Sequence, residues 1–120
     1  MRILLADEHP KVRSAIRLLL EQKLGENTID DISNSKELLD YLNSYCPDLL
    51  FLDWELPGFV PDKLLMKLRA SYPDLVIIAL DSKPETRRVA FNAGVDEFVN
   101  KNEPPDHLFN VVKRYKNSDS

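Results

Sequence analysis

The sequence predicts an α/β fold in which helices cover both faces of one parallel, five-stranded, doubly wound sheet. Short apolar bursts alternate with amphipathic stretches along the chain, in the order strand then helix, five times. Continuous apolar runs are typical of strands that are buried on both faces. Their alternation with helices favours parallel strands joined by right-handed crossovers. The length of 120 residues suits one compact domain.

The five expected strands are short and mostly apolar, and the second is the weakest because two acids interrupt it. Each is recognised by its apolar run and by the change of periodicity that follows it. The expected strands span residues 3–6, 28–32, 49–52, 75–80 and 98–99.

The five expected helices are recognised by apolar residues at helical spacing. Asn34 or Ser35 is the expected cap of the second helix. The fourth helix is expected over roughly residues 83–93, because residues 82–85 match a capping box and Gly94 follows. The stripes of the other four helices are Val12, Ile16, Leu19 and Leu20; Leu38, Leu39 and Leu42; Leu64, Leu65 and Leu68; and Leu108, Val111, Val112 and Tyr115.

Composition restricts the class of protein. The net charge is -4 and no block of like charge occurs, which argues against nucleic-acid contact by this domain. The single cysteine, Cys46, excludes an internal disulfide, and no apolar run is long enough to cross a membrane. We therefore expect a cytoplasmic protein, with one domain over residues 1–116 and a polar tail or the start of a linker over 117–120.

Polar residues follow four of the five expected strands, where a parallel sheet brings strand ends together. Several carboxylates so close would repel one another unless a cation joined them, and Mg²⁺ with oxygen ligands suits such a site. One carboxylate would remain free as a nucleophile that forms an acyl phosphate, while the metal and an ammonium stabilise the transferring group. The residues concerned are Asp7, Glu8, Asp53, Asp81, Ser82 and Lys101.

Three stretches, in this order, carry a resemblance to a known family: LLADEHPKVRSAIRLLL, LLFLDWELPG and AGVDEFVNK. Over about residues 2–116 the chain resembles the receiver domain of two-component response regulators. The opening DEHP, followed by VR and a leucine-rich helix, is most similar to receivers with a helix-turn-helix DNA-binding output domain. The resemblance implies a flavodoxin-like (βα)5 fold with strand order 2-1-3-4-5, a phosphorelay function and a role in transcription regulation.

The resemblance also implies roles for individual residues. Asp53 would accept a phosphoryl group from a histidine kinase or a phosphotransfer protein. Asp7 and Glu8 occupy the places of the acidic pair that binds Mg²⁺, with Glu8 where a second Asp is usual. The Glu55 backbone carbonyl would complete the protein's metal ligands, and Lys101 would contact the phosphoryl group. Such a domain is no conventional enzyme, since at most it catalyses its own phosphoryl transfer and hydrolysis.

The chain departs from the family pattern after the fourth strand. Asp81 stands where a Thr or Ser is expected, and an ionised carboxylate cannot donate a hydrogen bond to a phosphoryl oxygen. Ser82 is the other candidate for that contact, although it equally suits the role of a helix cap. Phe98 occupies the aromatic switch position, with core packing as the alternative. His9 is expected to be a helix cap or a surface residue rather than a metal ligand.

Other functions compete with the receiver hypothesis. Asp53 could simply begin the turn before Pro57. Because Asp81 stands in place of the expected Thr or Ser, a second hypothesis is a pseudo-receiver, a binding module of the same fold that is not phosphorylated. Asp53 and Glu55 resemble the paired acids of a haloacid-dehalogenase-type phosphatase, but those acids follow the first strand and here they follow the third. A flavin carrier would need a phosphate-binding loop after the first strand, where DEHPKVR presents acids instead. Dimerisation through the fourth helix, fifth strand and fifth helix is a further hypothesis.

Overall fold

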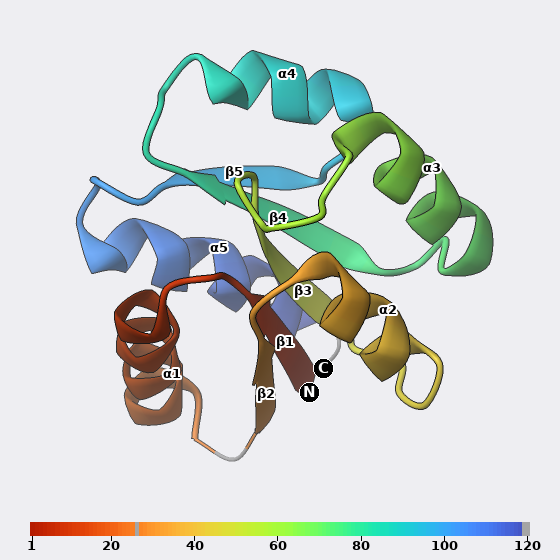
Figure 1. Ribbon diagram of the computed structural model, residues 1–120. Coiled ribbons are helices and arrows are strands. Elements are labelled where there is room, and N and C mark those ends of the chain that lie inside the picture. The colour runs from red at the N-terminus through yellow and green to blue at the C-terminus, as the bar shows by residue number, and fades with distance from the viewer. Residues whose placement is uncertain (26, 119–120) are drawn as a thin grey trace.

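The computed structural model describes residues 1–25 and 27–118, and it confirms the doubly wound sheet (Figure 1). Five parallel strands lie in the order β2-β1-β3-β4-β5, which is the order that the resemblance implies. The strands are β1 (Arg2–Ala6), β2 (Thr28–Ile32), β3 (Leu49–Asp53), β4 (Val76–Asp81) and β5 (Glu97–Asn100).

One helix follows each strand. Asn34 caps the second helix, because its side chain accepts a hydrogen bond from the Glu37 N–H. It is one of the two residues expected to do so. The last helix continues to Ser118, and residues 119–120 of the expected tail lie outside the described residues. The helices are α1 (Pro10–Leu24), α2 (Ser35–Leu42), α3 (Pro61–Ser71), α4 (Thr86–Ala93) and α5 (Pro105–Ser118).

The expected start of α4 is wrong by about three residues. Residues 83–86 instead form a turn in which the Thr86 N–H donates to the Lys83 carbonyl, and α4 begins at Thr86 without a side-chain cap from Glu85. The capping box therefore does not form. The end of α4 is as expected, because Gly94 adopts a left-handed φ of 114° that favours glycine.

Two apolar layers separate the sheet from its helices. Side chains alternate along the central strands, so Leu50 and Leu52 of β3 face one layer while Leu49 and Phe51 face the other. The first layer contains residues of α2, α3 and α4, and the second contains residues of α1 and α5, as the ribbon shows (Figure 1). No helix within 1–25 or 27–118 is long and apolar enough to cross a membrane.

Candidate functional site

The Lys101 ammonium lies between two buried carboxylates at the carboxyl edge of the sheet. Its Nζ is 2.7 Å from Asp7 Oδ2 and 3.3 Å from Asp53 Oδ1. Asp7 follows β1 and Asp53 ends β3, and these strands are neighbours. Each Asp is only 1% exposed. The strand order thus brings together three residues that are far apart in the sequence.

Backbone N–H groups fix both carboxylates. The His9 N–H donates to Asp7 Oδ1 at 2.8 Å, and the Glu55 N–H donates to Asp53 Oδ1 at 3.0 Å. The second oxygen of Asp53, Oδ2, is buried and has no hydrogen-bond partner among the described residues. An unpartnered buried carboxylate oxygen is costly, so this atom is suited to meet a cation or a reacting group.

Burial and charge act in opposite directions on these groups. Burial raises the pKa of Asp53 and Asp7 adds to that, whereas the Glu55 N–H and Lys101 oppose it. Burial by itself would lower the pKa of Lys101, but its contacts with Asp7 and Asp53 outweigh burial and raise it. Lys101 therefore keeps its proton, and one positive charge faces two carboxylates.

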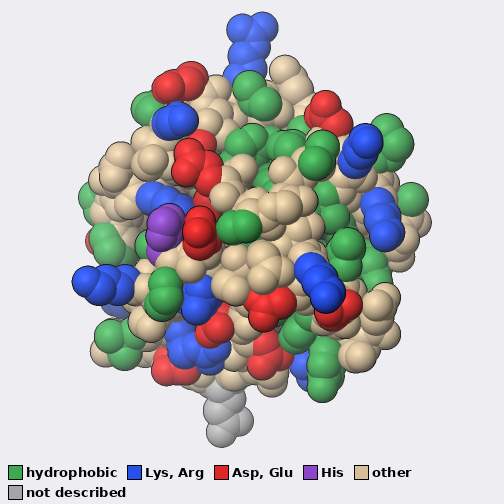
Figure 2. Space-filling model, viewed as in Figure 1, with side chains coloured by type: hydrophobic (Ala, Val, Ile, Leu, Met, Phe, Trp, Pro, Cys, Tyr) green, Lys and Arg blue, Asp and Glu red, His purple; other side chains and the backbone are tan. Residues whose placement is uncertain are grey.

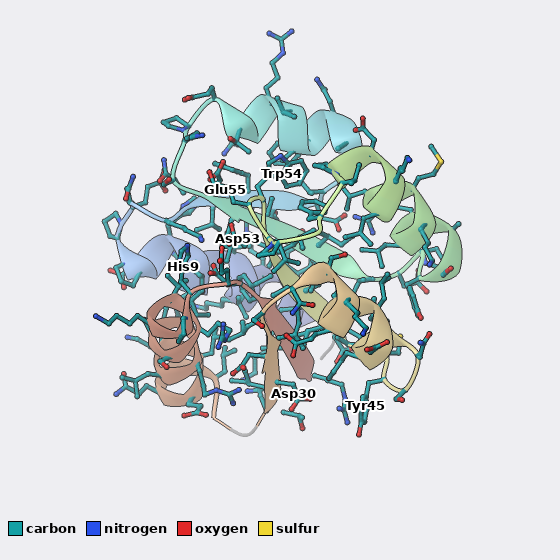
Figure 3. The ribbon with its side chains drawn as sticks, viewed as in Figure 1. His9, Asp30, Tyr45, Asp53, Trp54 and Glu55 are labelled. Atoms are coloured by element: carbon teal, nitrogen blue, oxygen red, sulfur yellow. The ribbon has the colours of Figure 1, made fainter. Side chains whose placement is uncertain are left out.

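A cation could be held by three side chains of this pocket. Asp7, His9 and Asp53 each offer one ligand atom, and these atoms lie within 4.8 Å of one another. Figure 3 shows His9 beside Asp53, with Glu55 and Trp54 on the turn that follows β3. Carboxylate oxygens suit hard divalent cations, so the two carboxylates of this set fit a metal of that class.

Neither Glu8 nor the Glu55 side chain belongs to this cluster of side chains, and the Glu55 ligand that the resemblance implies is the backbone carbonyl. Glu8 and Glu55 are exposed, and Glu55 Oε1 is 3.6 Å from Lys83 Nζ. Charged side chains of both signs gather on this face of the molecule, and a histidine lies among them (Figure 2).

Asp81 is buried at the end of β4 and both of its oxygens have donors. Oδ2 accepts a hydrogen bond from the Thr86 hydroxyl at 2.5 Å, and Oδ1 accepts one from the Ser82 N–H at 2.9 Å. The Lys101 N–H in turn donates to the Asp81 carbonyl at 2.9 Å. Asp81 therefore connects the pocket to the first residue of α4, while the Ser82 side chain is exposed.

Phe98 lies in the core rather than on the surface. It is 5% exposed and belongs to the same apolar layer as Ala90 of α4 and the neighbouring Val95. Trp54 is partly buried and contacts Phe59 edge to face, with ring centroids 5.2 Å apart. The aromatic residues near the site thus pack against the layer that carries α4.

The roles of two residues at this site cannot be predicted from the sequence. A lone histidine gives no metal-binding pattern, and His9 joins the carboxylates only because α1 begins beside them. Thr86 resembles an ordinary helix residue, and its bond to Asp81 depends on a turn that the sequence pattern assigned to the helix. An acid five residues before a threonine is too common to serve as a signal.

The sequence matches the response regulator receiver domain family over residues 3–113. It is 33% identical over 113 residues to the Fimbriae Z protein of Salmonella typhimurium, covering 92% of this chain and 54% of that protein. It is 27% identical over 112 residues to the nitrate/nitrite response regulator protein NarL of Escherichia coli, covering 92% and 52%. The chain spans about half the length of these curated relatives.

Solved structures agree with the family match. The isolated REC domain of RcsB from Salmonella enterica serovar Typhimurium, in the presence of phosphomimetic BeF3-, is 25% identical with a TM-score of 0.82, covering 94% of this chain and 86% of that one. A signal receiver domain from Colwellia psychrerythraea, 16% identical with a TM-score of 0.85 and covering 95% and 96%, shows the fold alone. The chain belongs to the response regulator receiver domain family, whose members are signalling phosphoacceptor modules rather than conventional enzymes.

Proposed function

We propose that this domain accepts a phosphoryl group on Asp53 from the phosphohistidine of a histidine kinase or phosphotransfer protein. One observation carries the assignment: Asp53 is buried, its Oδ1 is held by Lys101 and the Glu55 N–H, and its Oδ2 is unpartnered among the described residues. A fixed carboxylate with one free oxygen is prepared for attack on phosphorus.

The neighbours of Asp53 have complementary tasks in this proposal. Oδ2 of Asp53 attacks the phosphorus, the bond from phosphorus to the donor nitrogen breaks, and an acyl phosphate forms. Lys101 is positioned to neutralise charge on the phosphoryl oxygens as they arrive. It also remains paired with Asp7, which keeps the ammonium at the reaction centre.

Mg²⁺ is the cation that we assign to this pocket. Asp7 and Asp53 would hold it through their side chains, with Glu8 and the Glu55 backbone carbonyl as the other ligands that the family resemblance implies. Bound Mg²⁺ would supply neutralising charge for the carboxylates and the phosphoryl group. The unpartnered Oδ2 of Asp53 supports this fit.

Asp81 is the residue through which this chain would sense its own phosphorylation. A phosphoryl group on Asp53 adds negative charge near the Asp81 carboxylate, which favours states in which Asp81 moves or takes up a proton. Either change would weaken its bond to Thr86 and alter the position of α4. Phe98 would report that shift, since it packs in the layer that contains α4. The exposed Ser82 hydroxyl is our candidate for a direct phosphoryl contact.

The names of the relatives suggest the partners that we propose beyond the kinase. RcsB from Salmonella enterica serovar Typhimurium has been solved bound to a promoter, and NarL is named as a response regulator. Since the chain spans about half of the curated relatives, we propose a DNA-binding output domain outside it and a role in transcription regulation. We also place the domain in the cytoplasm and keep a homodimer as a hypothesis.

Intact-mass spectrometry after incubation with acetyl phosphate and Mg²⁺ tests the acceptor role. The wild type should gain one phosphoryl group, and Asp53→Asn should gain none. A folded wild type that binds Mg²⁺ but is phosphorylated by neither acetyl phosphate nor a panel of histidine kinases would instead indicate the non-phosphorylated binding module that Asp81 suggests.

A further inference from the structure

We propose that the His9 imidazole is a ligand of the cation in this pocket, so that the site, besides holding Mg²⁺, binds cations that accept a nitrogen ligand, such as Co²⁺ or Zn²⁺, more tightly than Mg²⁺. The inference deepens the proposed function, because it concerns the cation of the same pocket. It begins from the cluster of Asp7, His9 and Asp53, whose ligand atoms lie within 4.8 Å of one another.

The position of His9 leaves its ring available. His9 is the N-cap of α1 with φ -86° and ψ 114°, and its side chain makes no capping hydrogen bond. The ring is exposed, while the backbone N–H of the same residue fixes Asp7 Oδ1. The residue that orients one carboxylate through its backbone thus carries a possible nitrogen ligand close to both carboxylates, and Figure 3 shows it beside Asp53.

The two buried carboxylates of the pocket carry more negative charge than the neighbouring positive side chains balance. Both carboxylates are 1% exposed, and Asp53 Oδ2 has no hydrogen-bond partner in the described part of the chain. Lys101 supplies one charge for the two acids. Arg13 does not fill the deficit, because it donates to the backbone carbonyl of Asp7 and pairs with Asp31. A cation in contact with Asp53 Oδ2 would satisfy this buried atom.

The types of ligand atom determine which cation binds most tightly. Carboxylate and carbonyl oxygens suit Mg²⁺, whereas imidazole suits Zn²⁺ and other late first-row metals, which also bind more tightly in general. Two carboxylates with one imidazole therefore favour Co²⁺, Ni²⁺ or Zn²⁺ more than an all-oxygen site would. The 4.8 Å spread requires only a small closure of the three side chains around an ion.

Nitrogen NMR of the histidine rings tests ligation directly. The chain has two histidines, and His107 lies elsewhere, 2.5 Å from Glu103 through Nδ1 and Oε2. In protein labelled with ¹⁵N-histidine, adding Zn²⁺ should shift the ring nitrogens of His9 and leave those of His107 in place. His107→Gln assigns the signals and is the matched control variant.

Metal titrations followed by Trp54 fluorescence supply the second readout, since Trp54 is the only tryptophan and adjoins Asp53. His9→Gln should lower Co²⁺ affinity by about tenfold or more and change Mg²⁺ affinity by less than about twofold. His107→Gln should leave both affinities unchanged, and Asp53→Asn should weaken both cations. Circular dichroism checks that each variant is folded.

Two results would overturn the inference: equal Co²⁺ affinity in the wild type and His9→Gln, or ring nitrogens of His9 that Zn²⁺ does not shift. Absence of Co²⁺ and Zn²⁺ binding by the wild type would do the same. None of these results affects the acceptor role of Asp53, which phosphorylation with acetyl phosphate and Mg²⁺ tests separately. Conversely, failure of phosphorylation with the His9 shift intact would leave a metal site without phosphotransfer.

Discussion

The Thr86 hydroxyl donates a hydrogen bond to the Asp81 carboxylate, with 2.5 Å between Oγ1 and Oδ2, and so joins the first residue of α4 to the last residue of β4. Both residues are buried, at 8% and 4% exposure. A hydrogen bond to a buried charged group contributes more than one between neutral groups. The departure from the family pattern at Asp81 is therefore built into the packing of α4.

Thr86→Val should destabilise the domain by about 1–3 kcal/mol, because it keeps the shape of the side chain and leaves a buried carboxylate oxygen without its donor. Urea unfolding of the two proteins measures the difference. Thr86→Ser retains the hydroxyl and is the control, which should lose less. Equal stability of the Val and Ser variants would show that the bond contributes nothing.

Asp53→Asn should raise the free energy of unfolding at pH 7, because it removes a buried carboxylate that favours its neutral form in the folded protein. Burial raises the pKa of Asp53, so this carboxyl binds its proton more tightly in the folded protein than in the unfolded chain. The stability that this tighter proton binding contributes is present below the ordinary pKa of the carboxyl and is lost as pH rises through its pKa in the folded protein.

Urea unfolding at several pH values checks this sign. The advantage of Asp53→Asn over the wild type should be largest at neutral pH and shrink towards the ordinary carboxyl pKa of 3.8. A wild type that is the more stable protein at neutral pH would show that Lys101 compensates the buried charge completely.

Lys101→Met should destabilise the domain at neutral pH by up to about 3 kcal/mol, since it leaves two buried carboxylates without their ammonium. Mg²⁺ should restore part of the loss, because a bound cation would replace the missing charge. Thermal unfolding with and without Mg²⁺ measures both effects. Lys113→Met, at an exposed position, is the matched control and should change little.

Asp81→Asn should speed phosphorylation by acetyl phosphate, because it removes a negative charge from the end of β4, the strand that pairs with β3 and places Asp81 one residue beyond the partner of Asp53. A change on the order of 1 kcal/mol in the barrier corresponds to roughly a fivefold faster reaction. A time course of intact mass measures the rate. Asp74→Asn removes an exposed acid elsewhere and should have no effect. A slower reaction of Asp81→Asn would assign Asp81 a supporting role in phosphoryl transfer.

Most of the fold could be predicted because local signals agreed with the tertiary structure. The run that ends at Asp53 is apolar because β3 lies at the centre of the sheet, and Asn34 caps α2 through its own side chain. The start of α4 was predicted wrongly because Ser82 matches a cap by local pattern. In the structure the Asp81 carboxylate accepts hydrogen bonds from the Ser82 N–H and the Thr86 hydroxyl, and the chain forms a turn before the helix begins.

The candidate site could be predicted only in outline. Strand ends showed that Asp7, Asp53 and Lys101 would meet, and their distances confirm it. The proximity of His9 to the two acids depends on where α1 begins relative to the sheet, which no spacing in the sequence encodes. The free oxygen of Asp53 likewise depends on which donors reach its partner oxygen.

Chemical trapping of the acyl phosphate would locate the phosphoryl group on the chain. Borohydride reduces an aspartyl phosphate to homoserine, so protein treated with acetyl phosphate and Mg²⁺ can be reduced, digested and sequenced by mass spectrometry. We predict homoserine at position 53 alone, and none without the phosphoryl donor. Homoserine at position 7 or 81, or none in a folded protein that binds Mg²⁺ and has been treated with a kinase known to phosphorylate it, would contradict the assignment of Asp53 as the acceptor.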